Sequence, residues 1–290
     1  MRIIESLQEI RDICNGLKGE KVVIPTMGAL HQGHVALLSK AKEFDHVIAT
    51  LFVNPLQFNN SLDFNLYPDT RSKDIEIFEK NGVDILFAPR SKEMLESNHI
   101  DTIEANKSGD IWEGSYRPGH FTGVLTIVNR IFELIKPQHA VFGVKDLQQI
   151  CLIYSKLSSS HNVRIIPVKT ARNNDGLAYS SRNLLLSNKS QKKASIIFKA
   201  LKSGKDYWNS HRTIDGLKNR IEQVLNEESS FEIQYIKVTS LSELSKLEKI
   251  DNFSGLFREE GISDYKIVML AGYIEDIRLI DNLIVNSELF

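Results

Sequence analysis

The sequence predicts an α/β fold in which a doubly wound parallel sheet is followed by a smaller α+β domain. The first ninety residues alternate short apolar runs with amphipathic segments, in the order strand, helix, strand, helix, strand. This order is typical of a parallel sheet with right-handed crossovers. Near residue 180 the pattern changes to lysine-rich amphipathic segments followed by separate strand-like runs. We therefore predict a Rossmann-like domain over residues 1–180 and a smaller α+β domain over residues 181–290.

The predicted sheet of the first domain is built from short apolar runs. Such runs suit strands that are buried on both faces, as the strands of a parallel sheet are. The segments between them repeat apolar residues at helical spacing; two of them end near glycine, and one is stopped by Pro137. The predicted strands span 21–26, 46–53, 83–89, 140–143 and 163–168, and the predicted helices span 6–17, 35–44, 71–82, 122–136 and 145–157.

The remaining segments are less regular. Residues 97–120 are polar, and the length of this stretch favours a functional loop over a plain connection. The second domain is expected to begin with helices and to end with strands. Its predicted helices lie near 189–208 and 213–226, and its predicted strands lie at 232–238, 266–271 and 276–280.

The composition is that of a globular protein, and it limits the classes of partner that the chain is expected to bind. Of 290 residues, 42% are hydrophobic and 25% are charged, and the formal net charge is -1. This charge gives no global field for nucleic acid or an anionic membrane, so we expect neither as a partner. No apolar run approaches the roughly 18 residues of a membrane span, and the N-terminus lacks the apolar core of a signal peptide. Cys14 and Cys151 are far apart, which favours a reducing compartment, so we expect a soluble cytoplasmic protein.

The most informative motif is PTMGALHQGH at 25–34, between a predicted strand and a predicted helix. A helix N-terminus there offers unpaired N–H groups and the positive end of the helix dipole, and both suit a phosphate. Gly28 and Gly33 allow a sharp turn and a close approach to a ligand. His31 and His34 are three residues apart, so both can lie on one face of the first helical turn and donate hydrogen bonds, or a proton, to phosphate oxygens. The alternative is a pair of surface histidines at a helix cap.

Three weaker motifs contain groups that could meet a nucleotide. Gly143–Asp146 follows a predicted strand, where Lys145 could hold a phosphate and Asp146 a ribose hydroxyl or a metal. The alternative there is a solvated helix cap. The segment Ser180–Arg182 combines two hydroxyls with a guanidinium that could neutralise phosphate charge, or it is an ordinary turn. Arg117–His120 ends the polar loop and could equally be a rigid turn.

Together, these motifs resemble the pantothenate synthetase (pantoate–β-alanine ligase) family. An H-x-G-H motif alone would indicate only the wider nucleotidyltransferase superfamily, whereas all the blocks in one order indicate this family. The resemblance covers the chain from about residue 20 to 185. The matching stretches are PTMGALHQGH at 25–34, FVNPLQF at 52–58, YPDT at 67–70, WEGSYRPGHFTGV at 112–124, KPQHAVFGVKDLQQ at 136–149 and DGLAYSSRN at 175–183.

The resemblance implies a two-step reaction. Members of the family convert ATP and pantoate to pantoyl adenylate and pyrophosphate, and the amine of β-alanine then displaces AMP to give pantothenate. Mg²⁺ is implied with ATP, without an assignment of its protein ligands. A homodimer is implied as well, and so is a second domain that closes over the active-site cleft.

The resemblance also implies which residues contact ATP. His34 matches the family's proton donor, and His31, Lys145 and Arg182 complete the implied catalytic set. The implied ATP contacts are Met27, Gly28, Ala29, Leu30, His31, Gln32, Gly33, His34, Gly143, Val144, Lys145, Asp146, Ala171, Tyr179, Ser180, Ser181 and Arg182.

The implied acid-binding residues lie outside the phosphate loop. Gln57 and Gln149 match glutamines that hold pantoate, and Gln57 also matches a residue near the β-alanine site. His120 matches a residue that lines the same cleft. The chain departs from the family pattern in ways that leave the fine shape of the adenine pocket open, at Val144, Leu147, Ala171, Asn173 and Tyr179.

Two other functions stay open at this point. One is another nucleotidyltransferase of the H-x-G-H type, which joins ATP to a phosphorylated substrate. It would need extra cations for the second phosphate and would have no use for Gln57 and Gln149. The other is a non-catalytic nucleotide-binding or regulatory protein on the same fold. The argument against it is the presence of His31, His34, Lys145 and Arg182.

Overall fold

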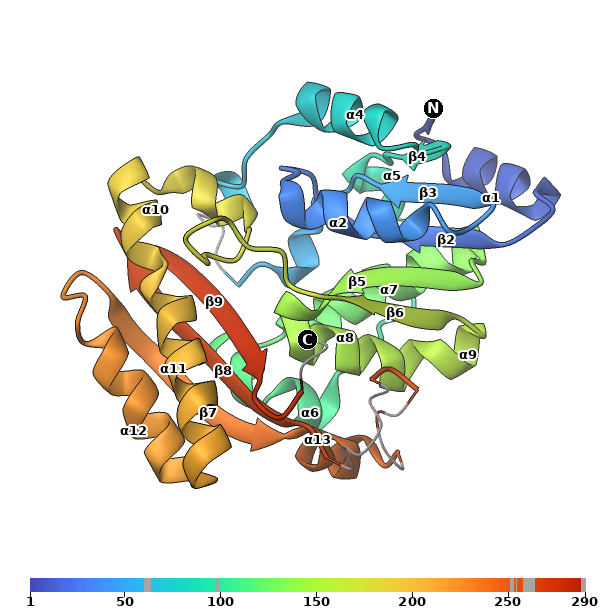
Figure 1. Cartoon of the computed structure of the whole chain (residues 1–290). Helices are drawn as coiled ribbons and strands as arrows, with labels where there is room; N and C mark the ends of the chain where they lie inside the picture. Colours follow the sequence, from blue (N-terminus) through green and yellow to red (C-terminus); the bar gives the residue numbers. More distant parts are fainter. Residues whose placement is uncertain (60–63, 97–99, 251–252, 254, 258–263, 288–290) are drawn as a thin grey trace. The chain divides into compact units, whose positions relative to one another are not determined.

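The computed structural model describes residues 1–59, 64–96, 100–250, 253, 255–257 and 264–287 (Figure 1). The chain divides into two compact units. The first comprises Met1–Gly143 and Gln148–Val168, and the second comprises Val144–Leu147 and the chain from Lys169 onward. The boundary predicted between residues 180 and 181 lies inside the second unit, so a functional division of the chain at that point stays a prediction.

A six-stranded parallel sheet forms the centre of the first unit, in the order β1-β4-β3-β2-β5-β6. Strand β2 pairs with β3 on one side and β5 on the other, so that Val23 lies opposite both Ile48 and Ala140. The predicted α/β class and the five predicted strands of the first domain are confirmed. A further edge strand, β1, was not predicted. The strands are β1 (Arg2–Ile4), β2 (Lys21–Ile24), β3 (His46–Thr50), β4 (Ile85–Phe87), β5 (His139–Gly143) and β6 (Arg164–Val168).

The strand order reverses beside β2. The chain adds β3 and β4 outward on one side of β2, and it then returns to add β5 and β6 on the other side. In open α/β sheets, ligands bind beyond the carboxyl ends of the strands at such a reversal. Strands β2 and β5 end at Ile24 and Gly143, so the loops that begin after these residues start where a ligand is expected.

Helices surround the sheet of the first unit (Figure 1), and their ends follow local signals in the sequence. Ser6 caps α1 by accepting a hydrogen bond from the N–H of Glu9. Helix α7 ends where Lys136 takes a left-handed conformation before Pro137, as the proline predicted. The helices are α1 (Leu7–Gly16), α2 (Gln32–Ala41), α4 (Arg71–Lys80), α5 (Ser91–Glu96), α6 (Asn106–Gly109), α7 (His120–Ile135), α8 (Leu147–Ile153) and α9 (Ser159–His161), the last two joined by a π-helical turn (Tyr154–Ser158).

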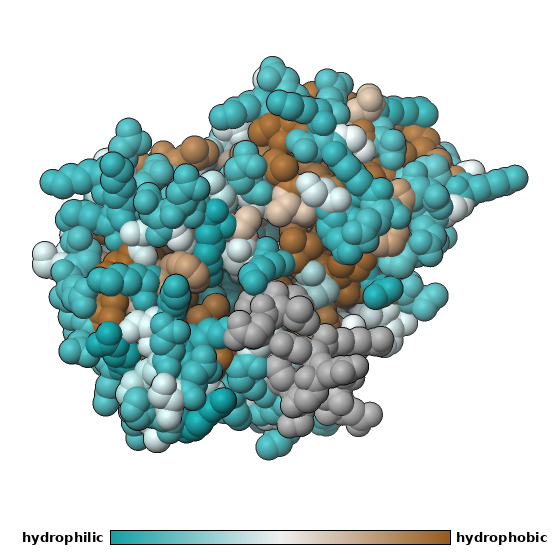
Figure 2. Space-filling view, viewed as in Figure 1, coloured by the Kyte–Doolittle hydropathy of each residue, from teal (hydrophilic) through white to brown (hydrophobic). Residues whose placement is uncertain are grey.

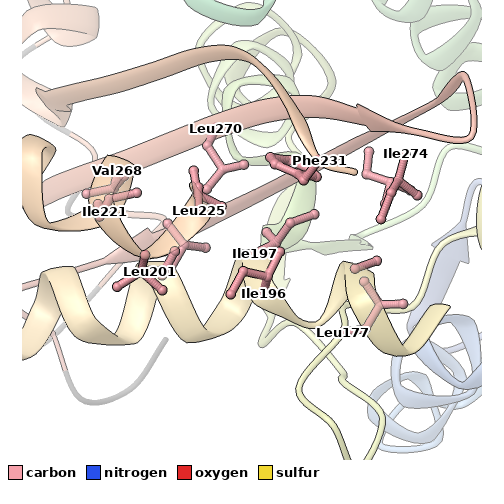
Figure 3. Packing of buried hydrophobic residues seen from close by; sticks show 14 of the residues in the cluster. Leu177, Ile196, Ile197, Leu201, Ile221, Leu225, Phe231, Val268, Leu270 and Ile274 are labelled. Atoms are coloured by element: carbon pink, nitrogen blue, oxygen red, sulfur yellow. The ribbon is translucent and has the colours of Figure 1, made fainter. Parts of the chain in front are cut away.

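The second unit contains a three-stranded antiparallel sheet with helices packed on it. Its core joins Leu201 of α11, Ile221 of α12 and Leu270 of β8 in one cluster (Figure 3). The single helix predicted near 189–208 is wrong in one respect, because two helices meet at Ser195. Helix α13 was not predicted. The elements are β7 (Glu232–Ser240), β8 (Lys266–Ile274), β9 (Ile277–Ile284), α10 (Asn188–Ala194), α11 (Ile196–His211), α12 (Ile214–Leu225) and α13 (Leu241–Glu248).

The surface is mixed in character. On the face shown in Figure 2, hydrophilic side chains cover most of the area, and hydrophobic ones form smaller patches between them. In the part of the chain that the structure describes, no helix is both long and apolar enough to cross a membrane.

Candidate active site

The loop that follows β2 carries the paired histidines, and its backbone takes a left-handed path. Gly28 and Ala29 have φ values of +82° and +50°, a region that favours glycine. A Cβ on Gly28 would lie 2.8 Å from Leu51 Cδ1 and 2.9 Å from Asp74 Oδ2. Glycine is therefore required at this position by both conformation and space.

Asp74 of α4 holds this backbone path. Its Oδ2 accepts a hydrogen bond from the N–H of Ala29 (2.9 Å), and its Oδ1 accepts one from the N–H of Leu30 (2.8 Å). The hydroxyl of Thr70 donates to Oδ2 at 2.9 Å. Asp74 is only 1% exposed, so water does not compete for these bonds. The loop is thus tied to α4 by a buried carboxylate.

His31 and His34 form a reciprocal capping pair at the start of α2. His31 Nδ1 accepts from the N–H of Gly33 (3.1 Å), and His34 Nδ1 accepts from the N–H of His31 (3.2 Å). The ring centroids are 4.1 Å apart, which confirms that both rings share one face of the first turn. Because each Nδ1 accepts, each neutral ring carries its proton on Nε2. Capping therefore uses Nδ1 of each ring, and the ring N–H is on Nε2.

The sequence predicted unpaired backbone N–H groups at this helix start, and this prediction is wrong for most of the loop. Two of them donate to Asp74, two donate to the histidine rings, and that of His34 donates to the carbonyl of His31. An anion here would be met by ring N–H groups and the helix dipole rather than by a cradle of backbone amides. The N–H groups concerned belong to Ala29, Leu30, His31, Gly33 and His34.

Gln57 ends the 3₁₀ turn Pro55–Gln57, and polar neighbours hold this turn in place. Asn54 Nδ2 donates to the Gln57 side-chain oxygen at 3.0 Å. The Gln57 carbonyl accepts from His120 Nδ1 at 2.8 Å, while His120 Nε2 accepts from Arg117 Nη1 at 3.0 Å. His120 is 5% exposed. The structure therefore places His120 against the backbone of Gln57, with both ring nitrogens engaged.

The adjacent glutamines of α8 have different surroundings. Gln148 is buried, and its Nε2 donates to the carbonyls of Ser108 and Ile111, both at 2.9 Å. Its Oε1 accepts from the N–H of Glu113 at 3.1 Å. Gln149 is half-buried. Gln148 therefore supports the polar loop that precedes α7. Nothing in the sequence distinguishes Gln148 from Gln149 in this respect.

Lys145 and Asp146 lie in a 3₁₀ turn that belongs to the second unit. Asn282 of β9 fixes this turn, because its Nδ2 donates to the carbonyls of Val144 (3.0 Å) and Lys145 (2.6 Å). Lys145 Nζ lies 3.5 Å from Asp146 Oδ1. Val144 is buried and lines a cavity of about 490 Å³ within the second unit. The lysine thus stands on a backbone that β9 holds rigidly.

A buried ion pair anchors the segment that carries the remaining predicted contacts. Arg172 donates to both carboxylate oxygens of Asp281, at 2.5 and 2.9 Å, and its guanidinium lies 4.0 Å from the centroid of the Phe198 ring. Next to this pair, the N–H of Tyr179 donates to the carbonyl of Ala171 at 3.1 Å. Two of the predicted ATP contacts are therefore neighbours.

The segment Ser180–Arg182 forms a capped turn. Ser180 accepts a hydrogen bond from the N–H of Arg182 at 3.4 Å and caps a 3₁₀ turn, Ser181–Leu185. Ser181 is buried, whereas Arg182 is half-buried. This agrees with the turn that the sequence left as the alternative, and the turn leaves the basic side chain of Arg182 partly at the surface.

Comparison with known proteins identifies the family. The model of the pantoate-beta-alanine ligase family matches residues 2–284. The chain belongs to this family. Pantothenate synthetase of Carboxydothermus hydrogenoformans is 38% identical over 99% of this chain and 100% of its own length. That of Halalkalibacterium halodurans is 39% identical over 90% of this chain and 89% of its own.

Solved structures of pantoate–β-alanine ligases share the fold. Pantothenate synthetase of Thermus thermophilus matches with a TM-score of 0.85 and 33% identity, over 99% of this chain and 100% of that one. Pantoate-beta-alanine ligase of Francisella tularensis, complexed with beta-gamma ATP and beta-alanine, matches with a TM-score of 0.79 and 32% identity over the whole of both chains. The resemblance drawn from the motifs is confirmed.

Some supporting residues carried no signal in the sequence. Asp74 reads as one more acidic residue on an exposed helix, and Asp281 as a polar interruption of a strand. Only the fold brings Asp74 to the loop and Asp281 to Arg172. Asn54 had a weak signal, because asparagine before proline favours a turn.

Proposed function

We propose that this member of the pantoate–β-alanine ligase family condenses (R)-pantoate with β-alanine at the expense of ATP. The reaction passes through pantoyl adenylate and releases pyrophosphate and then AMP. The match of the family over residues 2–284 carries this proposal. The chemistry is consistent with it, since a carboxylate must become an acyl phosphate anhydride before an amine can displace its oxygen.

In this proposal the histidine pair acts on the phosphates of ATP. Each ring can donate from Nε2 while Nδ1 caps the helix, so the donors are oriented before ATP arrives. We assign proton donation to His34 and charge stabilisation to His31, Lys145 and Arg182. The other ATP contacts expected from the resemblance stay as proposed, with Ala29 and Leu30 contributing shape rather than N–H groups, because their N–H groups donate to Asp74.

We propose that Gln57 and Gln149 hold pantoate, and that Gln57 also adjoins β-alanine. Neutral amides position the carboxylate without an ion pair that would blunt its attack on the α-phosphorus, and they can bond the hydroxyls of pantoate as well. The tie from Asn54 Nδ2 to the Gln57 oxygen supports this assignment, because it leaves the amide N–H groups of Gln57 to face a carboxylate.

Mg²⁺ is proposed as the metal that accompanies ATP. Within the described ranges, no three His, Cys, Asp or Glu side chains gather as a metal cluster. Mg²⁺ commonly takes one or two carboxylates together with substrate phosphates and water. Asp146, at the end of its 3₁₀ turn, has the chemistry for one such ligand or for a ribose hydroxyl.

The proposed homodimer, the cytoplasmic location and the lack of a nucleic-acid partner stay predictions. Light scattering coupled to size exclusion would measure the mass of the assembly directly. A mass equal to one chain, 33.0 kDa, would contradict the homodimer.

Isotope exchange between pyrophosphate and ATP tests the proposed reaction. Exchange should require pantoate and Mg²⁺ and should proceed without β-alanine, because adenylation comes first. His34→Ala should slow it by about 10²–10⁴-fold, the usual effect of losing a positioned acid or base. Ser39→Ala, at an exposed position of the same helix and outside the proposed ATP contacts, is the matched control. Exchange that appears only with β-alanine would refute the stepwise reaction.

A second assay tests the pantoate pocket. Gln149→Ala should weaken the use of pantoate strongly and leave ATP binding nearly unchanged. With a pantoate analogue that lacks one hydroxyl, the exchange rate relative to that with pantoate should fall much less in this variant than in the parent. In the parent, the analogue would leave the amide of Gln149 unpaired. Equal falls in the exchange rate of both proteins would show that Gln149 does not bond that hydroxyl. Exchange with a phosphorylated acceptor in place of pantoate would instead favour a different nucleotidyltransferase.

A further inference from the structure

The carboxylate of Asp74 occupies a position that resembles an anion-binding site. Two successive N–H groups, those of Ala29 and Leu30, converge on its two oxygens at 2.9 and 2.8 Å. Successive N–H groups beside left-handed residues form a concave nest that binds anions such as phosphate. Here the left-handed residues are Gly28 and Ala29. We propose that Asp74 is a built-in anion that fills this nest and thereby positions the histidine pair.

The contacts around Asp74 are those of a bound anion, because hydrogen-bond donors face both of its carboxylate oxygens. Both oxygens face N–H donors, and the hydroxyl of Thr70 adds a third donor to Oδ2 at 2.9 Å. With 1% of the residue exposed, neither water nor a solute anion competes for the nest. Charge-assisted hydrogen bonds of this kind are stronger than neutral ones.

The consequence reaches His31 through the chain. Leu30 is the residue before the cap, so its bond to Asp74 sets the direction in which the backbone enters α2. His31 then caps the helix, and its own N–H orients His34. Asp74 is therefore a positioning residue that acts through the loop. Its negative charge would repel phosphate, so its contribution is geometry and not attraction.

This inference rests on the proposed role of the histidines and can be tested apart from it. Asp74→Ala empties the nest and leaves a cavity of carboxylate size, which formate can enter. Asp74→Asn keeps one acceptor oxygen but turns the other into a donor that faces an N–H group. Asp84→Ala is the matched control, because it also removes a carboxylate that accepts a backbone hydrogen bond but lies outside the phosphate loop. Asp84 Oδ2 accepts from the N–H of Val47 in β3 at 2.8 Å.

The first readout is amide hydrogen exchange at Ala29 and Leu30 by NMR, which needs no activity. Exchange there should accelerate in Asp74→Ala and, to a smaller extent, in Asp74→Asn. Formate should slow it again in Asp74→Ala, whereas chloride at equal ionic strength should not. If Asp74→Ala does not fold, Asp74→Asn serves instead, because it retains more of the native contacts. Unchanged protection of both amides in Asp74→Asn would overturn the proposal.

The second readout is pyrophosphate exchange. Asp74→Ala should lower kcat by about 10²-fold, the scale of a small misplacement of catalytic groups, with a smaller change in the KM for ATP. Formate should recover part of the rate, and Asp84→Ala should behave as the parent. A purely structural role would give loss without recovery by formate and would overturn the proposal. An inactive parent enzyme would refute the proposed function, while the amide measurement would still decide the role of Asp74.

Discussion

Replacing Asp281 by leucine should destabilise the second unit, because it leaves the guanidinium of Arg172 buried without its counterion. The side chains are 2% and 14% exposed, so solvent replaces little of what is lost. Breaking a buried pair by removing one partner typically costs about 3–5 kcal/mol. Arg172 keeps its bond to the carbonyl of Gly176 and its position over Phe198, and a cation–π contact is worth roughly 0.5–2 kcal/mol. We therefore expect the low end of the range, about 3 kcal/mol.

The assay is native-state hydrogen exchange of amides in β8 and β9, which reports the free energy of opening of the second unit itself. Removing both partners, with Arg172→Met and Asp281→Leu, should restore most of the loss, because no buried charge remains. The control is Glu227→Gln, which breaks the exposed pair with Lys199 and should change little. A loss below about 1 kcal/mol for Asp281→Leu, or a double variant no better than the single one, would refute the reasoning.

Three further changes test other parts of the structure. Gly28→Ala should reduce pyrophosphate exchange and lower the free energy of unfolding by at least the roughly 1–2 kcal/mol that a left-handed alanine costs. Urea unfolding measures this loss, and Gly16→Ala is the control, because the added carbon there meets nothing within 4 Å beyond its chain neighbours and its own helix backbone. Equal effects of the two substitutions would contradict this. Burial lowers the pKa of His161 below its usual 6.5, with Glu133 opposing the shift, so the unfolded chain binds more protons. Stability present above pH 6.5 should therefore fall as the pH drops through the lowered value, and His161→Gln should flatten that fall in urea midpoints compared between pH 7.5 and pH 5. Burial raises the pKa of the Cys14 thiol to about 11, so iodoacetamide at pH 8 should leave Cys14 unmodified in the folded protein. Mass spectrometry of the peptide that contains Cys14 measures the modification. Rapid labelling would contradict the burial of this thiol.

The strands of the first unit could be predicted because parallel strands need apolar residues on both faces. Short runs such as 21–26 and 163–168 have that property regardless of their neighbours. Strand β1 escaped because it is only three residues long and lies next to charged residues, and its pairing with β4 decides its conformation. The break at Ser195 escaped for a similar reason, since nothing in the local periodicity marks it.

The candidate site could be predicted only in part. The paired histidines have a spacing that implies a shared helix face, and the rings are indeed 4.1 Å apart. What the spacing could not reveal is where the backbone N–H groups go, because Asp74 lies more than forty residues away and reaches them through the fold. The same holds for Arg172 and Asp281, which are 109 residues apart in the chain.

The assignment of Val144–Leu147 to the second unit has a consequence for dissecting the protein. The chain passes from one unit to the other at residues 143, 147 and 168. A fragment that begins at Lys169 would therefore leave Asn282 without the two carbonyls that its amide donates to, those of Val144 and Lys145. Unfolding of that unit in the intact chain would in turn release Lys145 from its fixed backbone. Neither unit can therefore be excised with a single cut, because the segment Val144–Leu147 of the second unit lies within the sequence of the first.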